Sequence, residues 1–324
     1  MNNKIRIVPA VLALVLAGLS GGVCAQTYPD KPVRLIVPFG AGGPGDILGR
    51  LMSKKLTESL GQSVVVDNRA GASTIIGTEM AAKSAPDGYT LLLISTTHAV
   101  NPSLFKKLPY DPVRDFAPVT MVAATPFMLV VHPAVPANSV AELVAYAKSK
   151  PKQLNYASSG NGSSIHLTTE LFASAAGIEM THVPYKGSGP AFIDVMAGQV
   201  QLLFSSTVSS LPHVKSGKVR GLALTSPKRA AALPNVPTIA ESGYPGFESS
   251  SWFGLLVPVQ TPQPVINRLL ADVRLALKAP EVNETLVGQG AEPGGKAPAE
   301  FGAYFRAELQ KWAKVVKAAK IEME

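Results

Sequence analysis

Short apolar runs alternate with amphipathic segments along most of the chain. Strands are predicted at residues 33–39, 63–68, 90–95, 120–132, 154–158, 181–185, 200–206 and 219–226. Helices are predicted at residues 46–60, 74–82, 140–149, 166–176, 190–197, 264–277 and 298–318. Because strands that alternate with helices of this length are typical of parallel sheets, the pattern predicts an α/β fold with a mostly parallel sheet.

The apolar run at residues 120–132 is too long for one strand of such a sheet, and it carries Pro126 near its middle. Proline cannot donate a hydrogen bond to a neighbouring strand, so we expect two segments joined by a crossover between two domains. A second crossover is expected near residues 250–254, after which the last helices pack on the first domain. The prediction is a discontinuous first domain, an inserted second domain and a hinge of two crossing strands. The predicted limits are residues 26–126 and 254–324 for the first domain and 127–253 for the second.

The first 25 residues have the pattern of a secretory signal peptide. Lys4 and Arg6 precede an apolar run, and small residues lead to Ala25, after which we expect cleavage. The apolar run is too short for a good membrane span. A lipid anchor at Cys24 is the alternative. Cleavage after Ala25 removes Cys24, the only cysteine, so the mature chain would have no disulfide, cysteine nucleophile or thiolate metal site. The expected location is the periplasm.

The mature chain is mildly basic. The 30 lysines and arginines, less the two in the signal, exceed the 22 acidic residues by six. This excess favours anionic small molecules or an anionic surface as partners. The basic residues are scattered and form no patch interleaved with aromatic residues, so we expect no nucleic-acid partner.

A glycine-rich segment at residues 40–45 has the spacing G-x-G-x-x-G between a predicted strand and a predicted helix. Asp67 follows at the end of the next strand, which nearly completes a dinucleotide-binding fingerprint. Pro44 and Asp46 stand where a pyrophosphate needs open backbone and no negative charge, and Asp46 is predicted to cap the helix. Exposed backbone N–H groups at a helix start bind carboxylates as well as phosphates. The segment therefore favours a carboxylate site over a dinucleotide site or a purely structural turn.

A second loop, residues 156–164, has the same design of strand, small polar residues and helix start. Its hydroxyls and amides can hold a carboxylate without a buried cation. Ser163 and His166 also invite comparison with a hydrolase. However, their spacing is local helix spacing, and the chain has no G-x-S-x-G elbow. We therefore expect a ligand loop or a helix cap and no catalytic residues.

The five histidines form no H-x-x-x-H pair and have no carboxylate cluster at metal spacing, so no metal site and no cofactor are predicted. His98 ends a predicted strand and would face a cleft. The alternative is a hydrogen-bonded histidine on the surface or behind the site. Arg50 and Arg69 could each pair with a ligand acid, although such residues more often tie down a neighbouring loop.

Seven ordered motifs resemble one family of receptors. They are PFGAGGPGD, VVVDNRAGASTIIG, APDGYTLLL, NYASSGNGSSIHL, HVPYKGSGPAFIDVMAGQV, TSPKRAAALPNVPTIAESGYPGFE and SWFGLLVP. Together they resemble the Bug family, the periplasmic substrate-binding receptors of tripartite tricarboxylate transporters, over essentially the whole mature chain. The resemblance implies two α/β domains of the periplasmic-binding-protein kind (type II like) that close on a small carboxylate in the cleft between them.

The resemblance also implies ligand contacts. One wall of the cleft would carry Phe39, Gly40, Ala41, Gly42 and Gly43, with Asp46 opening the helix. The facing domain would carry Ser158, Ser159, Gly160, Asn161 and Ser163. Strand ends would add Thr97, His98, Tyr185 and Ser205. Where the family commonly has G-x-V-D, this chain has Gly198-Gln199-Val200-Gln201, and Gln201 argues slightly against a ligand with an amino group.

The expected function is therefore that of a receptor. It would act as a monomer in the periplasm, capture a small organic acid, aromatic or not and with one or two carboxylates, and deliver it to the membrane components of a tripartite transporter. Two alternatives stay open: a ligand-sensing partner of a signalling membrane protein, and an exported enzyme that uses the same cleft.

Overall fold

The computed structural model describes residues 28–41, 44–185, 187–230, 233–288 and 290–318, so the predicted signal peptide lies outside the described residues. The strands are β1 (Val33–Val37), β2 (Val64–Asn68), β3 (Thr90–Ser95), β4 (Phe116–Val131), β5 (Asn155–Ser158), β6 (Thr181–Pro184), β7 (Leu202–Ser206), β8 (Arg220–Leu224), β9 (Ser250–Pro258) and β10 (Glu292–Pro293). The helices are α2 (Pro44–Leu60), α3 (Ile75–Ala82), α4 (Thr96–Leu104), α5 (Val140–Ser149), α6 (Ser164–Ala176), α7 (Ser188–Met196), α8 (Thr207–Lys215), α9 (Gln263–Lys278), α10 (Pro280–Gly288) and α11 (Pro298–Ala318), with a short 3-10 helix at Ala72–Thr74.

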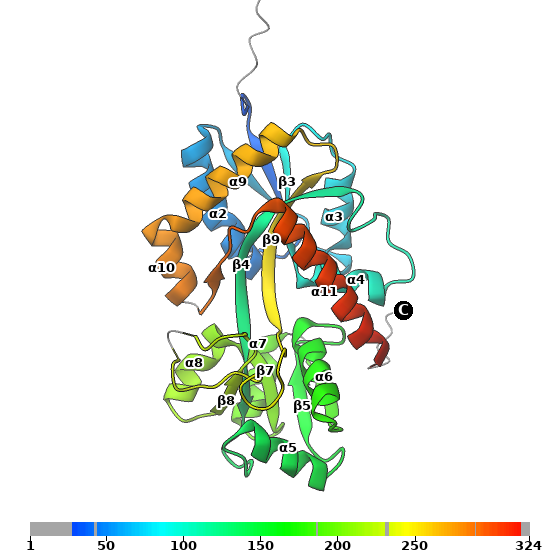
Figure 1. Cartoon of the computed structure of the whole chain (residues 1–324), viewed down its shortest axis with the longest axis vertical. Helices are drawn as coiled ribbons and strands as arrows, with labels where there is room; N and C mark the ends of the chain where they lie inside the picture. The colour runs from blue at the N-terminus through cyan, green and yellow to red at the C-terminus, as the bar shows by residue number, and fades with distance from the viewer. Residues whose placement is uncertain (1–27, 42–43, 186, 231–232, 289, 319–324) are drawn as a thin grey trace, which may run out of the picture.

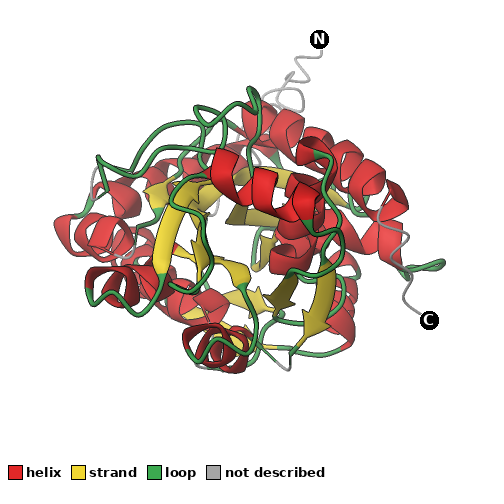
Figure 2. Ribbon diagram, turned by 90° about the horizontal axis from the view of Figure 1, so that it is seen from below, coloured by secondary structure: helices red, strands yellow, loops and turns green. Residues whose placement is uncertain are grey.

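The molecule consists of two halves joined by the long strands β4 and β9 (Figure 1). The first half holds β1, β2, β3 and helices α2, α3, α4, α9, α10 and α11. The second half holds β5 to β8 and helices α5 to α8. One sheet passes through both halves in the order β2-β1-β3-β9-β4-β7-β5-β6, with β8 and β10 also pairing with β4. Seen along the long axis, the strands lie inside and the helices surround them (Figure 2).

Helices cover both faces of the sheet in the first half. Alternate residues of β1 point to opposite faces: Val33, Leu35 and Val37 join the core under α2, α9 and α10, whereas Ile36 joins the core under α3, α4 and α11. The second half has two cores as well, one under α5 and α6 and one under α7. No described helix has the combination of length and apolar character that a membrane crossing requires.

The sheet is mixed, which corrects the prediction of a mostly parallel sheet. Strand β1 is parallel to β2 and β3, and β5 is parallel to β6 and β7. By contrast, β9 is antiparallel to both β3 and β4, and β4 is antiparallel to β7 and β8. The two strands that connect the halves run in opposite directions because the chain leaves the first half along β4 and returns along β9.

Pro126 lies inside the single continuous strand β4, so the expectation of two separate segments is wrong. Residues up to Pro126 pair with β9, and from Phe127 onward the strand pairs with β7. Proline's missing N–H group therefore falls at the residue where β4 exchanges one partner for another, and an interruption in the hydrogen-bond ladder is tolerated there. The return strand lies where it was expected, with Pro126 opposite Ser250. The domain limits at residues 126 and 254 stay a prediction.

A buried carboxylate fastens the last helix to the return strand. Glu308 of α11 is almost fully buried, and its Oε2 accepts hydrogen bonds of 2.9 Å from the indole N–H groups of both Trp252 and Trp312. Lys311 forms an ion pair with the other carboxylate oxygen. Trp252 belongs to β9, so this contact ties the end of the chain to the strand that joins the halves.

Replacing Glu308 with leucine is expected to lower the free energy of unfolding by about 3 kcal/mol, because two buried indole N–H groups lose their acceptor. Urea unfolding followed by circular dichroism measures the change. The exposed Glu284 of α10 provides the control, since Glu284→Leu is expected to change stability by less than about 0.5 kcal/mol. Equal effects of the two substitutions would show that the indole contacts contribute nothing.

Candidate functional site

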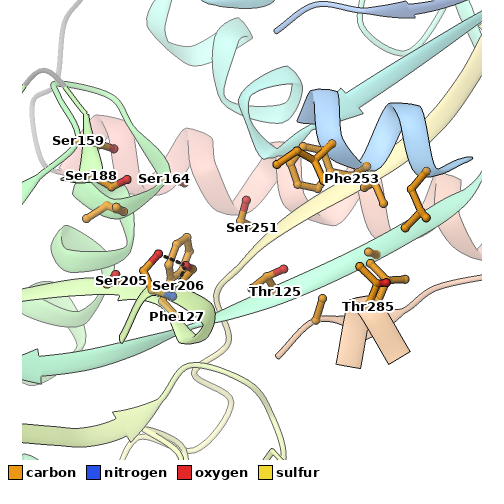
Figure 3. Close-up of a pocket in the computed structure, with 18 residues that line it drawn as sticks. Thr125, Phe127, Ser159, Ser164, Ser188, Ser205, Ser206, Ser251, Phe253 and Thr285 are labelled. Carbon is orange, nitrogen blue, oxygen red and sulfur yellow. Dashed lines mark hydrogen bonds between the residues drawn. The ribbon is translucent and has the colours of Figure 1, made fainter. Parts of the chain in front are cut away.

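A cavity of about 400 Å³ lies between the two halves, and 18 of the described residues line it. The lining comes from α2, α10 and β9 on one side and from α6, α7, β7 and α8 on the other, and β4 crosses between them (Figure 3). Half of the lining residues carry a hydroxyl group, and none of those described carries a charge. The volume falls in the range of small-molecule sites.

Three helices of the second half begin at this cavity. Ser164 is the first residue of α6, Ser188 is the first residue of α7, and Ser206 caps α8, whose Ser209 also lines the cavity. The Oγ of Ser206 accepts a hydrogen bond from the N–H of Ser209. Helix starts carry a partial positive charge and N–H groups without partners inside the helix. This wall therefore favours an anion although none of its described lining side chains is cationic.

Ser205 is the most buried hydroxyl residue of the cavity, with 1% of its surface exposed. Its side chain forms no hydrogen bond to any described residue, and the same holds for the hydroxyls of Ser159, Ser164 and Ser188, which line the same wall. Buried polar groups are generally hydrogen-bonded. Of these four residues only Ser205 is buried, whereas Ser159 and Ser164 are half-buried and Ser188 is exposed. Together their hydroxyls offer donors for a ligand.

The crossing strands form the middle of the cavity. Thr125 of β4 and Ser251 of β9 are directly paired in the antiparallel register, and both line the cavity. Figure 3 shows them between the serine-rich wall and Phe253. A ligand in the cavity would thus touch both strands that connect the halves.

The wall of the first half is apolar. Phe253, Leu51 and Leu286 line it, together with Ile47 at the rim, which is half exposed. The ring of Phe39 meets the ring of Phe253 edge to face at 5.9 Å, so Phe39 supports this wall from behind. Thr285 also lines this side, but its hydroxyl donates to the carbonyl of Glu281 within α10.

The glycine-rich segment is described only in part, because Gly42 and Gly43 lie outside the described residues. Gly40 and Ala41 are exposed, and neither lines the cavity. At Gly45 a Cβ atom would lie 2.4 Å from the ring of Phe39, so the close packing of this ring requires a glycine. Contact of these loop residues with a ligand stays a prediction.

Asp46 does not cap α2, as the sequence suggested, because it lies in the first turn of a helix that begins at Pro44. Its carboxylate is buried and accepts hydrogen bonds from Arg50 (3.0 Å) and from Asn68 (2.9 Å). Arg50 and Asn68 thus hold the start of α2 against β2. A similar role explains Arg69, whose guanidinium binds Asp67 at 2.8 Å. Both arginines tie down neighbouring loops, as the more frequent alternative predicted.

The serine-rich loop after β5 reaches the cavity through Ser159 alone among its predicted contacts. Ser158 is buried behind it and hydrogen-bonds the ring of His182 at 2.6 Å. Ser163 caps α6 by accepting a hydrogen bond from the N–H of His166. Gly160, with φ of +127°, provides the sharp turn, and Asn161 is exposed.

Two histidines stack beneath this loop. The rings of His166 and His182 lie 3.8 Å apart and almost parallel, and Nδ1 of His166 accepts a hydrogen bond from the N–H of Gly162. Burial, assisted by the neighbouring His182, lowers the pKa of His166 to about 4. The two rings are therefore neutral at pH 7 and serve as packing and acceptors for the loop.

Three other predicted contacts do not line the cavity. Thr97 lies in the first turn of α4, where its N–H donates to the capping Ser95. His98 is buried between the rings of Tyr110 and Phe305, and its Nε2 donates to the carbonyl of Pro112. The hydroxyl of Tyr185 donates to Asp194 at 2.7 Å. His98 thus matches the alternative of a histidine away from the cleft.

Gln201 gives no information about the ligand, which corrects the earlier inference from its position. Its side-chain oxygen accepts a hydrogen bond from the N–H of Asn155, at the start of β5. It precedes β7, whereas the cavity residues Ser205 and Ser206 end that strand. The glutamine therefore joins β5 to β7 at the far end of the sheet.

Several lining residues could not be singled out from the sequence. Ser188 and Phe253 lie in motifs that were recognised, but the motifs do not show which of their residues line the cavity and which pack in the core. Thr125 and Ser251 are found only once the register of β4 and β9 is known. The described residues hold no cluster of three metal-ligating side chains.

An α/β structure whose halves enclose a cavity beside two connecting strands is that of the periplasmic solute-binding proteins, and solved structures of this class match the chain. The structure of R. palustris Rpa4515 with adipate covers 91% of this chain and all of its own, at 41% identity and a TM-score of 0.78. The structure of MatC from Rhodopseudomonas palustris with malate covers 89% of this chain and 100% of its own, at 33% identity and a TM-score of 0.74.

The family model of the tripartite tricarboxylate transporter family receptor matches residues 48–321, and the chain belongs to this family. Protein BugT of Bordetella pertussis is 40% identical over 318 residues, which are 97% of this chain and 98% of that protein. The resemblance read from the seven motifs is thereby confirmed.

Burial of His98 predicts a pH dependence of stability. Burial lowers the pKa of His98 to about 4, whereas an unfolded histidine titrates near 6.5. Between these values the unfolded state binds more protons, so the free energy of unfolding falls as the pH is lowered from about 6.5 to about 4.

In urea titrations at pH 7 and pH 4.5, His98→Phe is expected to remove part of this loss, on the order of 3 kcal/mol at most. His166 keeps a residual pH dependence in the variant, because its pKa is lowered in the same direction. If wild type and variant lose the same stability between the two pH values, burial of His98 does not contribute.

Proposed function

We propose that this protein is a periplasmic receptor that binds a small organic carboxylate in the cavity between its halves and passes it to the membrane components of a tripartite transporter. The observation that carries the proposal is the wall on which three helix starts and several unpaired hydroxyls meet, in a cavity whose described lining carries no charge. Membership of the receptor family and the acids named for two related structures support it.

The crossing strands provide the route for closure. We propose that the halves are domains with limits near residues 126 and 254, and that β4 and β9 bend between them. Closure requires that the ligand bind the closed form more tightly than the open form. Contacts from both halves to one ligand would provide this difference, because only the closed form allows all of them at once.

The periplasmic location rests on the signal-like first 25 residues and on relatives such as the periplasmic binding protein BugD. A ligand-sensing receptor for a signalling membrane protein would use the same cavity. An exported enzyme is the third possible function. The described lining does not support it, because it holds hydroxyls but no histidine or carboxylate that could act as a base.

A thermal-shift panel of monocarboxylates, dicarboxylates, aromatic acids and amino acids tests the proposal. A receptor is expected to show a raised melting temperature with one group of acids, because binding to the native state alone stabilises it. The same acids, incubated with the protein and analysed by chromatography, are expected to be recovered unchanged. Release of a product would contradict the receptor function and favour an enzyme.

Removing a single hydroxyl tests the serine-rich wall. Ser159→Ala is expected to weaken binding of the acid found in the panel by about 1 to 3 kcal/mol, as measured by calorimetry, with little change in the melting temperature. Ser174, exposed on α6 away from the cavity, provides the matched control, and Ser174→Ala is expected to bind as wild type does. Unchanged affinity of Ser159→Ala would remove this residue from the site.

A further inference from the structure

We infer, on the basis of the proposed function, that the ligand is a monocarboxylic acid with an apolar body and that it binds in one orientation. Its carboxylate lies against the serine-rich wall formed by the starts of α6, α7 and α8. Its apolar body lies against the wall formed by Phe253, Leu51 and Leu286.

The serine-rich wall is suited to a negative charge. Helices α6, α7 and α8 have 13, 9 and 9 residues, and none has an acidic residue in its first turn. The partial positive charges at these helix starts are therefore not neutralised by the chain itself. Figure 3 shows the labelled serines of this wall grouped on one side of the cavity.

Ser205 gives independent evidence that a polar ligand group belongs at this wall. The residue is 99% buried, lines the cavity and makes no side-chain hydrogen bond among the described residues. Because Ser205 lines the cavity, a ligand or a water molecule there can pair with its hydroxyl. An ionised carboxylate is the acceptor that forms the strongest hydrogen bonds with such donors.

The described part of the wall formed by Phe253, Leu51 and Leu286 has neither unpaired hydroxyls nor a helix start that is free of acidic residues. Ser251 of β9 lies with Thr125 in the middle of the cavity, and the hydroxyl of Thr285 is bonded within its own helix. The other described lining side chains on this side are apolar. The helix that begins beside it, α2, already has the buried carboxylate of Asp46 in its first turn. Arg50, one turn further along α2, is bonded to Asp46 and Asn68. Among the described residues, this wall therefore offers no partner for a second carboxylate.

The contrast between the serine-rich wall and the apolar wall disfavours dicarboxylic acids and amino acids, because their second polar group would lose its water. A second carboxylate placed against Phe253 and Leu51 would lose water without gaining a partner, which is strongly unfavourable. The amino group of an amino acid would find no acidic side chain in the described lining. An alkyl chain or an aromatic ring, by contrast, replaces water on apolar surface.

Two pairs of acids that differ only at the far end test the inference. Calorimetry on the mature chain compares hexanoate with adipate and 4-methylbenzoate with terephthalate. In each pair that binds, the monoacid is expected to bind at least tenfold more tightly. A diacid that binds as tightly as its partner, or a panel in which only diacids or amino acids bind, overturns the inference and leaves the receptor function intact. If no acid of the panel binds, the proposed function fails, and the inference fails with it.

A charge placed at the apolar wall tests the orientation. Ile47 lines the cavity and is 50% exposed, so Ile47→Lys is expected to fold. The new cation is expected to weaken the binding of hexanoate and to strengthen the binding of adipate. The ratio of the two affinities is expected to change by at least tenfold in favour of adipate. Leu275 of α9 is 62% exposed and does not line the cavity, and Leu275→Lys is the control with the same change of charge. A ratio that changes equally in both variants would overturn the orientation.

Discussion

The antiparallel pairing of β4 with β9 is the contact on which the rest of the structure depends. It runs from Phe116 opposite Pro258 to Pro126 opposite Ser250, and it is the only sheet pairing among the described residues that leads from one half toward the other. It fixes the register that brings Thr125 and Ser251 together on the cavity. The buried carboxylate of Glu308 then secures this strand pair to the last helix through Trp252.

Local patterns in the sequence were sufficient for much of the fold. Buried β1 and β3 are apolar runs, and α5 follows a capping box in which Ser139 accepts from the N–H of Glu142 and the carboxylate of Glu142 accepts from Asn138. Helices α4 and α8 were missed because each is short and contains a proline, Pro102 or Pro212. The directions of β4 and β9 were missed because apolar runs do not encode strand direction.

Site residues could be predicted from the sequence only where a polar residue directly follows a strand that ends at the cavity. Ser159 and Ser205 follow strand ends and line the cavity, as the motifs suggested. Thr97, His98 and Tyr185 also follow strand ends, yet each is engaged elsewhere, because a position near the cleft does not determine where a side chain points. The opposite error occurred at Gln201. Its departure from the family pattern was interpreted as information about the ligand, but its side chain accepts a hydrogen bond from the N–H of Asn155, at the end of β7 away from the cavity.

The position of β9 has a consequence for the order in which the chain can fold. This strand comes from residues 250–258, yet it lies between β3 and β4 in the sheet. The first half therefore lacks a middle strand until most of the chain is available, and its N-terminal portion cannot complete a stable sheet alone. Contacts between residues this far apart in sequence slow folding. In a chain with this topology the sheet of the first half therefore stays open at its middle until the last quarter of the sequence, from Ser250 onward, can insert β9.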